Sequence, residues 1–168
     1  MARILSLVGV VAAVAGLLAS PSAGATVSLS TSYALAGTET SIPTNNTSTF
    51  AGTALGSRFD VAWWKASVVH QSLSSCPFGS GKSCAIKGGT FSLKSSTGAQ
   101  LAGSFTNGSV TPVFQAAGCG RQVFAVSGTL ATTAGPGSFS ATLTHYRTVL
   151  FGACVPYFAT VTGSLHLS

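Results

Sequence analysis

Side chains that could do acid or base chemistry are scarce in this chain of 168 residues. Glu39 and Asp60 are its two carboxylic acids, and nothing in their spacing places them together. Glycoside hydrolysis usually needs two carboxyl groups that flank one bond. A serine hydrolase needs an acid, a histidine and a Gly-x-Ser-x-Gly turn that presents the nucleophile, and the sequence lacks that turn. We therefore expect a protein without catalytic residues.

Metal ligands show no recognisable pattern either. The three histidines, His70, His145 and His166, are scattered, and neither HxH nor HExxH spacing occurs. The cysteines lack the CxxC spacing of structural zinc sites. We assign no metal and no cofactor.

His145 and Arg147 occupy an unusual place in the hydrophobic pattern. Alternation with period 2 puts Phe139, Ala141 and Leu143 on one face of a strand and continues directly to His145 and Arg147. Either the strand leaves the core here and both side chains meet solvent, or both line a barrel mouth. In a barrel mouth, a few polar groups in an apolar pocket would orient a small ligand.

Two adjacent tryptophans must point to opposite faces of a strand. Phe59 and Val61 share a face with Trp63, so we predict Trp63 in the core and Trp64 exposed, where an aromatic ring can stack on a sugar or a partner. Tyr157 is likewise either a core residue or an exposed aromatic ring that binds a sugar or a partner. The candidate ligand-binding residues are therefore Trp64, His145, Arg147 and Tyr157.

The N-terminus has the features of an export signal. Arg3 precedes an uncharged apolar run over residues 4–18, and residues 23–25 read Ala-Gly-Ala, a pattern that signal peptidase cleaves. The run is shorter than the roughly 20 residues of a membrane-spanning helix. We expect residues 1–25 to be a signal peptide and residues 26–168 to form a single secreted all-β domain, extracellular or in the cell envelope.

An even number of cysteines in an exported protein indicates disulfides. Cys76, Cys84, Cys119 and Cys154 allow three pairings. The segment between Cys76 and Cys84 is short and contains proline and glycine, so we favour this pair, which leaves Cys119 for Cys154.

Composition limits the partners. Charged residues make up 6% of the chain, against roughly 25% in an ordinary domain, and 46% hydrophobic residues argue against disorder. After residue 25 the seven cations and two acids give a formal charge of +5, and the cations are scattered. Nucleic-acid binders cluster such cations. We expect no nucleic-acid partner and at most a weak attraction to anionic surfaces.

The elements that would position these side chains are strands. Alternation of apolar and small polar residues predicts seven to nine of them, for example over residues 99–105, 139–143 and 155–165. Glycine-containing turns are predicted at residues 96–98, 107–108 and 134–137. Residues 37–48 have little apolar content and are predicted to form a long mobile loop.

A repeated triplet favours one architecture. Glycine, a hydroxyl residue and then Phe or Leu recur five times, and the glycine and the large residue share a face. Glycine inside a strand permits strong coiling and leaves room for a neighbouring ring. The pattern predicts a closed or nearly closed antiparallel β-barrel, with a β-sandwich as the alternative. The triplets begin at Gly89, Gly103, Gly128, Gly137 and Gly163.

Two stretches resemble parts of the avidin family of secreted eight-stranded barrels. They are residues 52–56 leading to 61–63, and residues 89–91 followed by 98–105. Their order is reversed relative to avidins, and the tryptophans that stack on biotin have no counterpart beyond Trp63 and Trp64. The resemblance implies shared barrel chemistry and no biotin site.

These features predict a binding function. We expect a secreted, non-catalytic barrel that binds a small apolar ligand, a glycan or a protein partner. The alternatives are a structural protein of the cell surface or envelope, and a small outer-membrane barrel with its apolar face towards lipid. Asn45, Asn46 and Asn107 match the pattern of glycosylation acceptors. Ligand identity, oligomeric state and glycosylation stay open at this level.

Overall fold

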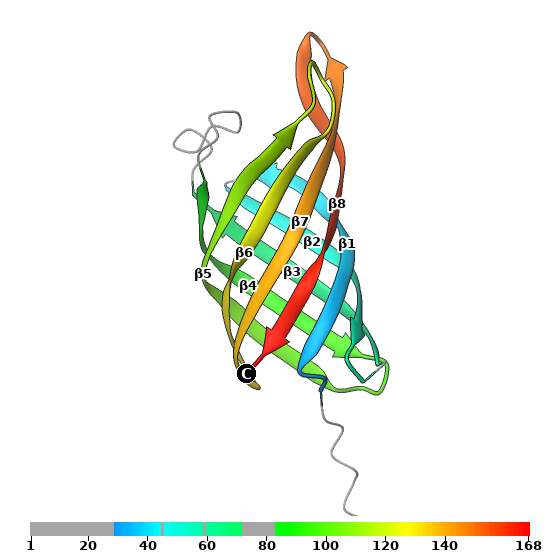
Figure 1. The fold of residues 1–168 in the computed structure, drawn as a ribbon, viewed down its shortest axis with the longest axis vertical. Coiled ribbons are helices and arrows are strands. Elements are labelled where there is room, and N and C mark those ends of the chain that lie inside the picture. Colours follow the sequence, from blue (N-terminus) through cyan, green and yellow to red (C-terminus); the bar gives the residue numbers. More distant parts are fainter. Residues whose placement is uncertain (1–28, 45, 59, 72–82) are drawn as a thin grey trace, which may run out of the picture.

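The computed structural model describes residues 29–44, 46–58, 60–71 and 83–168, which form a closed antiparallel barrel (Figure 1). Each strand pairs with its neighbours in the sequence, and β8 returns to β1. The predicted barrel is confirmed, and the alternative β-sandwich is wrong. The strands are β1 Ser32–Thr44, β2 Thr47–Gly56, β3 Val61–His70, β4 Cys84–Ser95, β5 Gln100–Gln115, β6 Gln122–Thr132, β7 Gly135–Leu150 and β8 Ala153–Leu167.

Several expectations fall outside the described residues. The signal peptide predicted for residues 1–25 is one, and the half-cystine at Cys76 and the acceptor Asn45 are others. Within the described ranges, no helix is long and apolar enough to cross a membrane.

Side chains alternate between an apolar interior and a hydroxyl-rich exterior. On β6, Phe124 and Leu130 are buried, whereas Ala125, Ser127 and Thr129 between them are exposed. All eight strands contribute to one interior cluster in this way. Full burial of a large apolar side chain stabilises the fold by about 1.5–3 kcal/mol, so this alternation supplies the main driving force for the barrel.

Two glycines of the strands, Gly37 and Gly128, make room for aromatic rings. A Cβ at Gly37 on β1 would lie 2.7 Å from Cζ2 of Trp64 on β3, and a Cβ at Gly128 on β6 would lie 2.8 Å from Cε1 of Phe139 on β7. Any larger residue would displace these rings. Gly128 belongs to the repeated triplets and shows the room for a neighbouring ring that they predicted, whereas the other four triplet glycines lie against backbone or aliphatic atoms.

The mobile loop predicted for residues 37–48 is wrong. β1 continues to Thr44, and β2 begins at Thr47. Low apolar content misled the prediction, because the strand pairs with β2 through its backbone and through hydroxyl groups. The Oγ1 atoms of Thr40 and Thr49, for example, lie 2.9 Å apart.

One of the three predicted turns is also wrong. Asn107 and Gly108 lie within β5, just after a bulge at which Thr106 is the extra residue opposite β6. A bulge uses the same residue types as a turn, and here it bends the strand without ending it. The turn at residues 96–98 is confirmed. The turn expected at 134–137 is formed by Thr133 and Ala134, and β7 already begins at Gly135.

The two ends of the barrel differ. At the packed end, where β1 begins and β8 ends, Tyr33, Leu93, Leu101 and Leu165 are each at most 1% exposed. At the other end, called here the cavity end, β5, β7 and β8 are 15 or 16 residues long, whereas β2 and β3 have 10. The β7–β8 hairpin therefore projects beyond the barrel (Figure 1).

Candidate functional site

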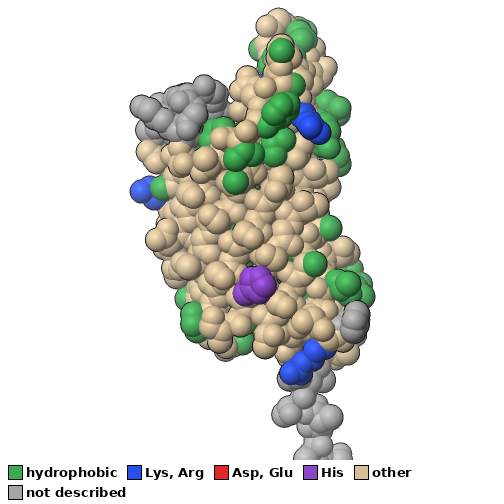
Figure 2. All heavy atoms as spheres, in the orientation of Figure 1, with side chains coloured by type: hydrophobic (Ala, Val, Ile, Leu, Met, Phe, Trp, Pro, Cys, Tyr) green, Lys and Arg blue, Asp and Glu red, His purple; other side chains and the backbone are tan. Residues whose placement is uncertain are grey.

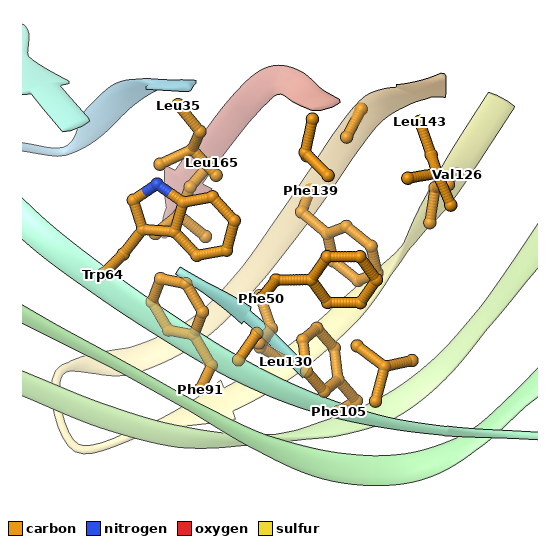
Figure 3. A pocket seen from close by; sticks show the side chains of 14 residues that line it. Leu35, Phe50, Trp64, Phe91, Phe105, Val126, Leu130, Phe139, Leu143 and Leu165 are labelled. Atoms are coloured by element: carbon orange, nitrogen blue, oxygen red, sulfur yellow. The ribbon is translucent and has the colours of Figure 1, made fainter. Parts of the chain in front are cut away.

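An apolar cavity of about 70 Å³ lies in the middle of the barrel (Figure 3). All 14 lining residues are apolar, and all eight strands contribute to them in alternation. Rings from β2, β3, β4, β5 and β7 face one another across it. These rings belong to Phe50, Trp64, Phe91, Phe105 and Phe139.

Trp64 is part of this wall, which corrects the predicted orientation of the tryptophan pair. Its side chain is 4% exposed, whereas Trp63 is 55% exposed. The indole Nε1–H of Trp64 donates to the carbonyl oxygens of Ala36, at 3.2 Å, and Thr53, at 3.0 Å. The missed signal was Lys65, because a cation two residues after Trp63 marks that face as the solvent side.

A second cavity, also of about 70 Å³, adjoins the first towards the cavity end. The two share four lining residues, Phe50, Val68, Val126 and Leu143. The second differs in its polar residues. These are Glu39, Ser48, His70 and His145. The barrel interior therefore changes from wholly apolar to partly polar along its axis.

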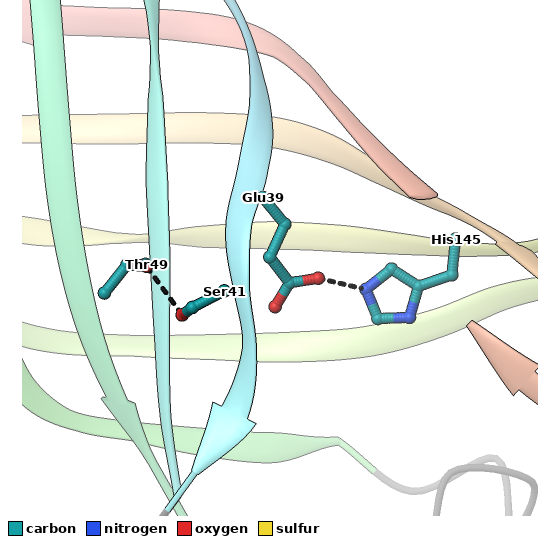
Figure 4. A network of polar contacts seen from close by, with 4 residues as sticks. All are labelled: Glu39, Ser41, Thr49 and His145. Atoms are coloured by element: carbon teal, nitrogen blue, oxygen red, sulfur yellow. Dashed lines mark hydrogen bonds and ion pairs between the residues drawn. The ribbon is translucent and has the colours of Figure 1, made fainter. Parts of the chain in front are cut away.

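Glu39 and His145 form the polar end of this interior (Figure 4). Oε2 of Glu39 lies 3.1 Å from Nε2 of His145, and their side chains are 10% and 13% exposed. The two groups are not aligned for a hydrogen bond, so the buried Nε2 atom of His145 has no hydrogen-bond partner among the described residues. The Phe124 ring meets the imidazole edge to face, with centroids 5.3 Å apart.

Of the two interpretations of His145, the structure agrees with the interior position, because the strand does not leave the core there. Glu39 was missed as its neighbour, because its segment was assigned to a loop. The signal was present: Tyr33, Leu35, Gly37 and Glu39 alternate on one face of β1.

Arg147 and Tyr157 do not line the interior cavities. Nε of Arg147 donates to the carbonyl oxygen of Gly120 at 2.8 Å, which ties β7 to the end of the β5–β6 hairpin. Tyr157 is 68% exposed. The β7–β8 register shifts after Tyr146, so Tyr157 is the extra residue of a bulge and leaves the face predicted from Ala159. Of the four predicted candidates, Trp64 and His145 therefore line the interior cavities, Arg147 is half-buried beyond them, and Tyr157 is exposed.

The barrel wall opens between β1 and β8 at this level. Their pairing ends at Thr38 and Thr160, after which β1 follows β2 and β8 follows β7. A groove of about 220 Å³ occupies the gap. Glu39 lines both this groove and the inner polar cavity, so it stands between solvent and the interior. Tyr157 and Phe158 form part of the outer rim.

A disulfide links Cys119 to Cys154, with the two Cα atoms 5.4 Å apart. This predicted pair is confirmed, and such a bond is consistent with an extracellular protein. Cys84 is buried on β4 and disulfide-bonded. The predicted pairing of Cys84 with Cys76 lies outside the described residues.

The packed end has its own polar cluster. The Tyr33 hydroxyl donates to Oδ2 of Asp60 at 3.2 Å and accepts from the Ser30 N–H at 3.1 Å, while Ser30 Oγ donates to Oδ1 of Asp60. Burial raises the pKa of Tyr33 above its ordinary value; the Asp60 charge adds to this effect, and the Ser30 N–H opposes it. Every group of this cluster has a partner.

Other candidate positions are dispersed. His70 lines the polar cavity, whereas His166 is exposed on β8, and the described part of the chain has no group of three or more residues suited to hold a metal ion. Asn46 occupies the β1–β2 turn with a φ of 62°, and Asn107 is exposed on β5.

Comparisons with protein families, with curated proteins and with solved structures found no match for this chain. The function must therefore be argued from the site itself.

Proposed function

We propose that this protein is a secreted, non-catalytic barrel that binds one small, elongated apolar molecule in its interior. The observation that carries the proposal is the pair of adjacent cavities, apolar through the middle of the barrel and polar at Glu39 and His145. An eight-stranded barrel is just wide enough to hold one small ligand. Ligand pockets typically combine apolar walls with a few placed polar groups, and this interior has that composition.

The polar end favours a ligand whose head group is a hydroxyl or another neutral group. A ligand hydroxyl can donate to the Glu39 carboxylate and accept from the imidazole of His145, which supplies a partner for Nε2. A carboxylate head group would instead face the like charge of Glu39 at short range.

The gap between β1 and β8 is the proposed route into the interior. It lies where the two strands stop pairing, so a ligand can pass without breaking inter-strand hydrogen bonds. Glu39 borders both the outer groove and the inner cavity. The Glu39–His145 pair would therefore separate to admit the ligand and then bind its head group.

The alternatives receive less support. An outer-membrane barrel places apolar side chains outward and polar ones inward, and the alternation here is the reverse. A structural assembly has no use for an apolar interior cavity. A sugar-stacking role would fall to the exposed Trp63 rather than to Trp64. A location outside the cytoplasm remains part of the proposal and agrees with the disulfide.

Displacement of toluene, used as the apolar probe, by n-alkanols of increasing length, followed by isothermal titration calorimetry, tests the proposal. Affinity should rise about fourfold per added methylene, which corresponds to about 0.8 kcal/mol. It should level off once the cavities are filled. Alkanoates of equal length should bind more weakly, and Glu39→Gln should reduce that difference. A protein that neither binds the probe nor releases it to any alkanol would contradict the proposal.

Two variants on β3 provide a matched pair. Ala66 lines the apolar cavity, so Ala66→Leu should fill it and weaken probe binding at least tenfold. Trp63 lies on the outer face of the same strand, so Trp63→Ala should leave probe binding unchanged. Equal losses in both variants would show that the probe binds the surface.

A further inference from the structure

The β7–β8 hairpin ends in three exposed apolar residues, Val149, Leu150 and Phe151, called here the apolar tip. Their side chains are 63%, 50% and 98% exposed. On the face shown in Figure 2, hydrophobic side chains gather over and just below this projecting end, whereas the middle of the barrel wall has few of them. The tip lies outside the interior cavities, so the proposed ligand does not account for it.

The turn itself uses an unfavourable residue. Phe151 and Gly152 connect the strands, with φ values of 49° and 79°. A two-residue hairpin with positive φ at both positions is typically Asn-Gly, because a bulky residue is strained there. Phe151 thus costs stability through its backbone and through its exposure to water, which points to a function for the ring.

The tip is held firmly to the rest of the molecule. Cys154, which pairs with Val149 across the hairpin, is disulfide-bonded to Cys119 in the connection between β5 and β6. Arg147 donates to the carbonyl oxygen of Gly120 in the same connection. Two hairpins therefore support the apolar tip, and its projection is part of the fold.

Aromatic residues and a cation surround the base of the tip. Phe114, Tyr157 and Phe158 are exposed there, and the Phe158 ring stacks on Tyr146 at 5.9 Å. Phe158 pairs with Tyr146, and Phe114 pairs with Val123, which lies opposite Thr144, so these rings lie roughly 10–20 Å below the tip at 3.3 Å per residue. Tyr157 is the extra residue of the bulge next to Phe158. Phe114, Tyr157 and Phe158 are called here the aromatic collar. The Arg121 guanidinium lies 5.2 Å from the centre of the Phe114 ring.

The charge at this end suits an anionic surface. The chain has only two carboxylic acids. Glu39 is buried against His145, and Asp60 is bonded to Tyr33 and Ser30 at the packed end. No carboxylate therefore flanks the three tip residues, while Arg121 is exposed beside Phe114 at their base.

We propose that the apolar tip inserts into the interface of an anionic lipid bilayer, with the aromatic collar at headgroup level and Arg121 near the phosphates. Aromatic rings favour that level, and cations are attracted to anionic lipids. A protein partner, including a second copy of this chain, fits less well. A stable protein interface buries about 800 Å² on each side, which three side chains on a narrow projection cannot supply.

Co-sedimentation of the mature protein with vesicles of phosphatidylcholine, with or without phosphatidylglycerol, tests this proposal. The protein should bind the anionic vesicles more tightly, and Arg121→Gln should reduce that preference. Phe151→Asn should weaken binding about tenfold, because one large apolar side chain no longer inserts. This variant installs the Asn-Gly pair that the turn favours, so loss of binding would not reflect misfolding. Absence of vesicle binding by the unaltered protein would overturn the proposal.

The matched control changes exposed apolar residues at the packed end. Leu55 and Trp63 are 49% and 55% exposed, and Leu55→Ser combined with Trp63→Ser should change vesicle binding less than twofold. An equal loss in this control and in Phe151→Asn would overturn the proposal in favour of nonspecific adsorption. Analytical ultracentrifugation without lipid tests whether the tip instead binds a second copy of the chain. A dimer that Phe151→Asn converts to a monomer would overturn the proposal and assign the tip to self-association.

Discussion

The packed end and the cavity end of the barrel use the same strand alternation for different purposes. At the packed end, Tyr33, Leu93 and Leu101 are each 1% exposed, and every polar group of the Tyr33 cluster has a partner. At the cavity end, the interior holds space, and the Nε2 atom of His145 lacks an aligned partner. One end therefore supplies stability, which allows the other to remain incompletely filled.

The largest expected effect comes from shortening a leucine at each end. Leu93→Ala should lower the free energy of unfolding by about 4 kcal/mol, and Leu143→Ala by about 2 kcal/mol, towards the two ends of the usual range. Leu143 already borders both cavities, so it has fewer packing contacts to lose. Urea denaturation measures both values. Equal losses would remove the distinction between the ends.

A smaller effect is expected from enlarging an alanine at each end of β3. Ala62 is fully buried at the packed end, so Ala62→Leu should cost about 1–3 kcal/mol through overpacking. Ala66→Leu should cost less than about 1 kcal/mol, because the new side chain enters existing space. Thermal unfolding followed by circular dichroism compares them. A larger cost for Ala66→Leu would mean that the cavity cannot accept added atoms.

The smallest expected effect concerns alkaline pH. Because the folded state raises the pKa of Tyr33 above its unfolded value, the folded protein holds this proton more tightly, and stability falls as pH rises above about 10. Tyr33→Phe should flatten this part of the stability profile, at a cost of about 1 kcal/mol at neutral pH for the lost hydrogen bonds. Denaturation midpoints across that range measure it. An unchanged alkaline slope in the variant would assign the slope to other groups.

Much of the fold could be predicted from alternation and glycine spacing, because both report directly on which face of a strand meets the core. The failures came where register changes. Tyr157 left its predicted face at a bulge, and Asn107 and Gly108 mark a bend instead of a turn. A bulge adds one residue without a distinctive composition, so a single sequence does not reveal which residue is unpaired.

The site was partly predictable for a related reason. Period 2 led correctly to His145 in the interior, but its partner Glu39 comes from a strand more than 100 residues away. Only the closure of β1 onto β8 brings the two together. Trp64 faces the interior and not the surface predicted for it, because Val61 and Trp63 lie on the solvent face of β3 together with Lys65.

Pro156 protects the unpaired edge of β8, at the gap between β1 and β8, from pairing with another chain. Strand edges that lack a partner can recruit a strand from another chain and start edge-to-edge aggregation. Pro156 lies on β8 before its pairing with β1 begins at Thr160, and proline has no N–H to offer an incoming strand. The bulge at Tyr157 further disrupts the row of donors. The gap thus stays open to a small molecule while its edge resists a foreign polypeptide.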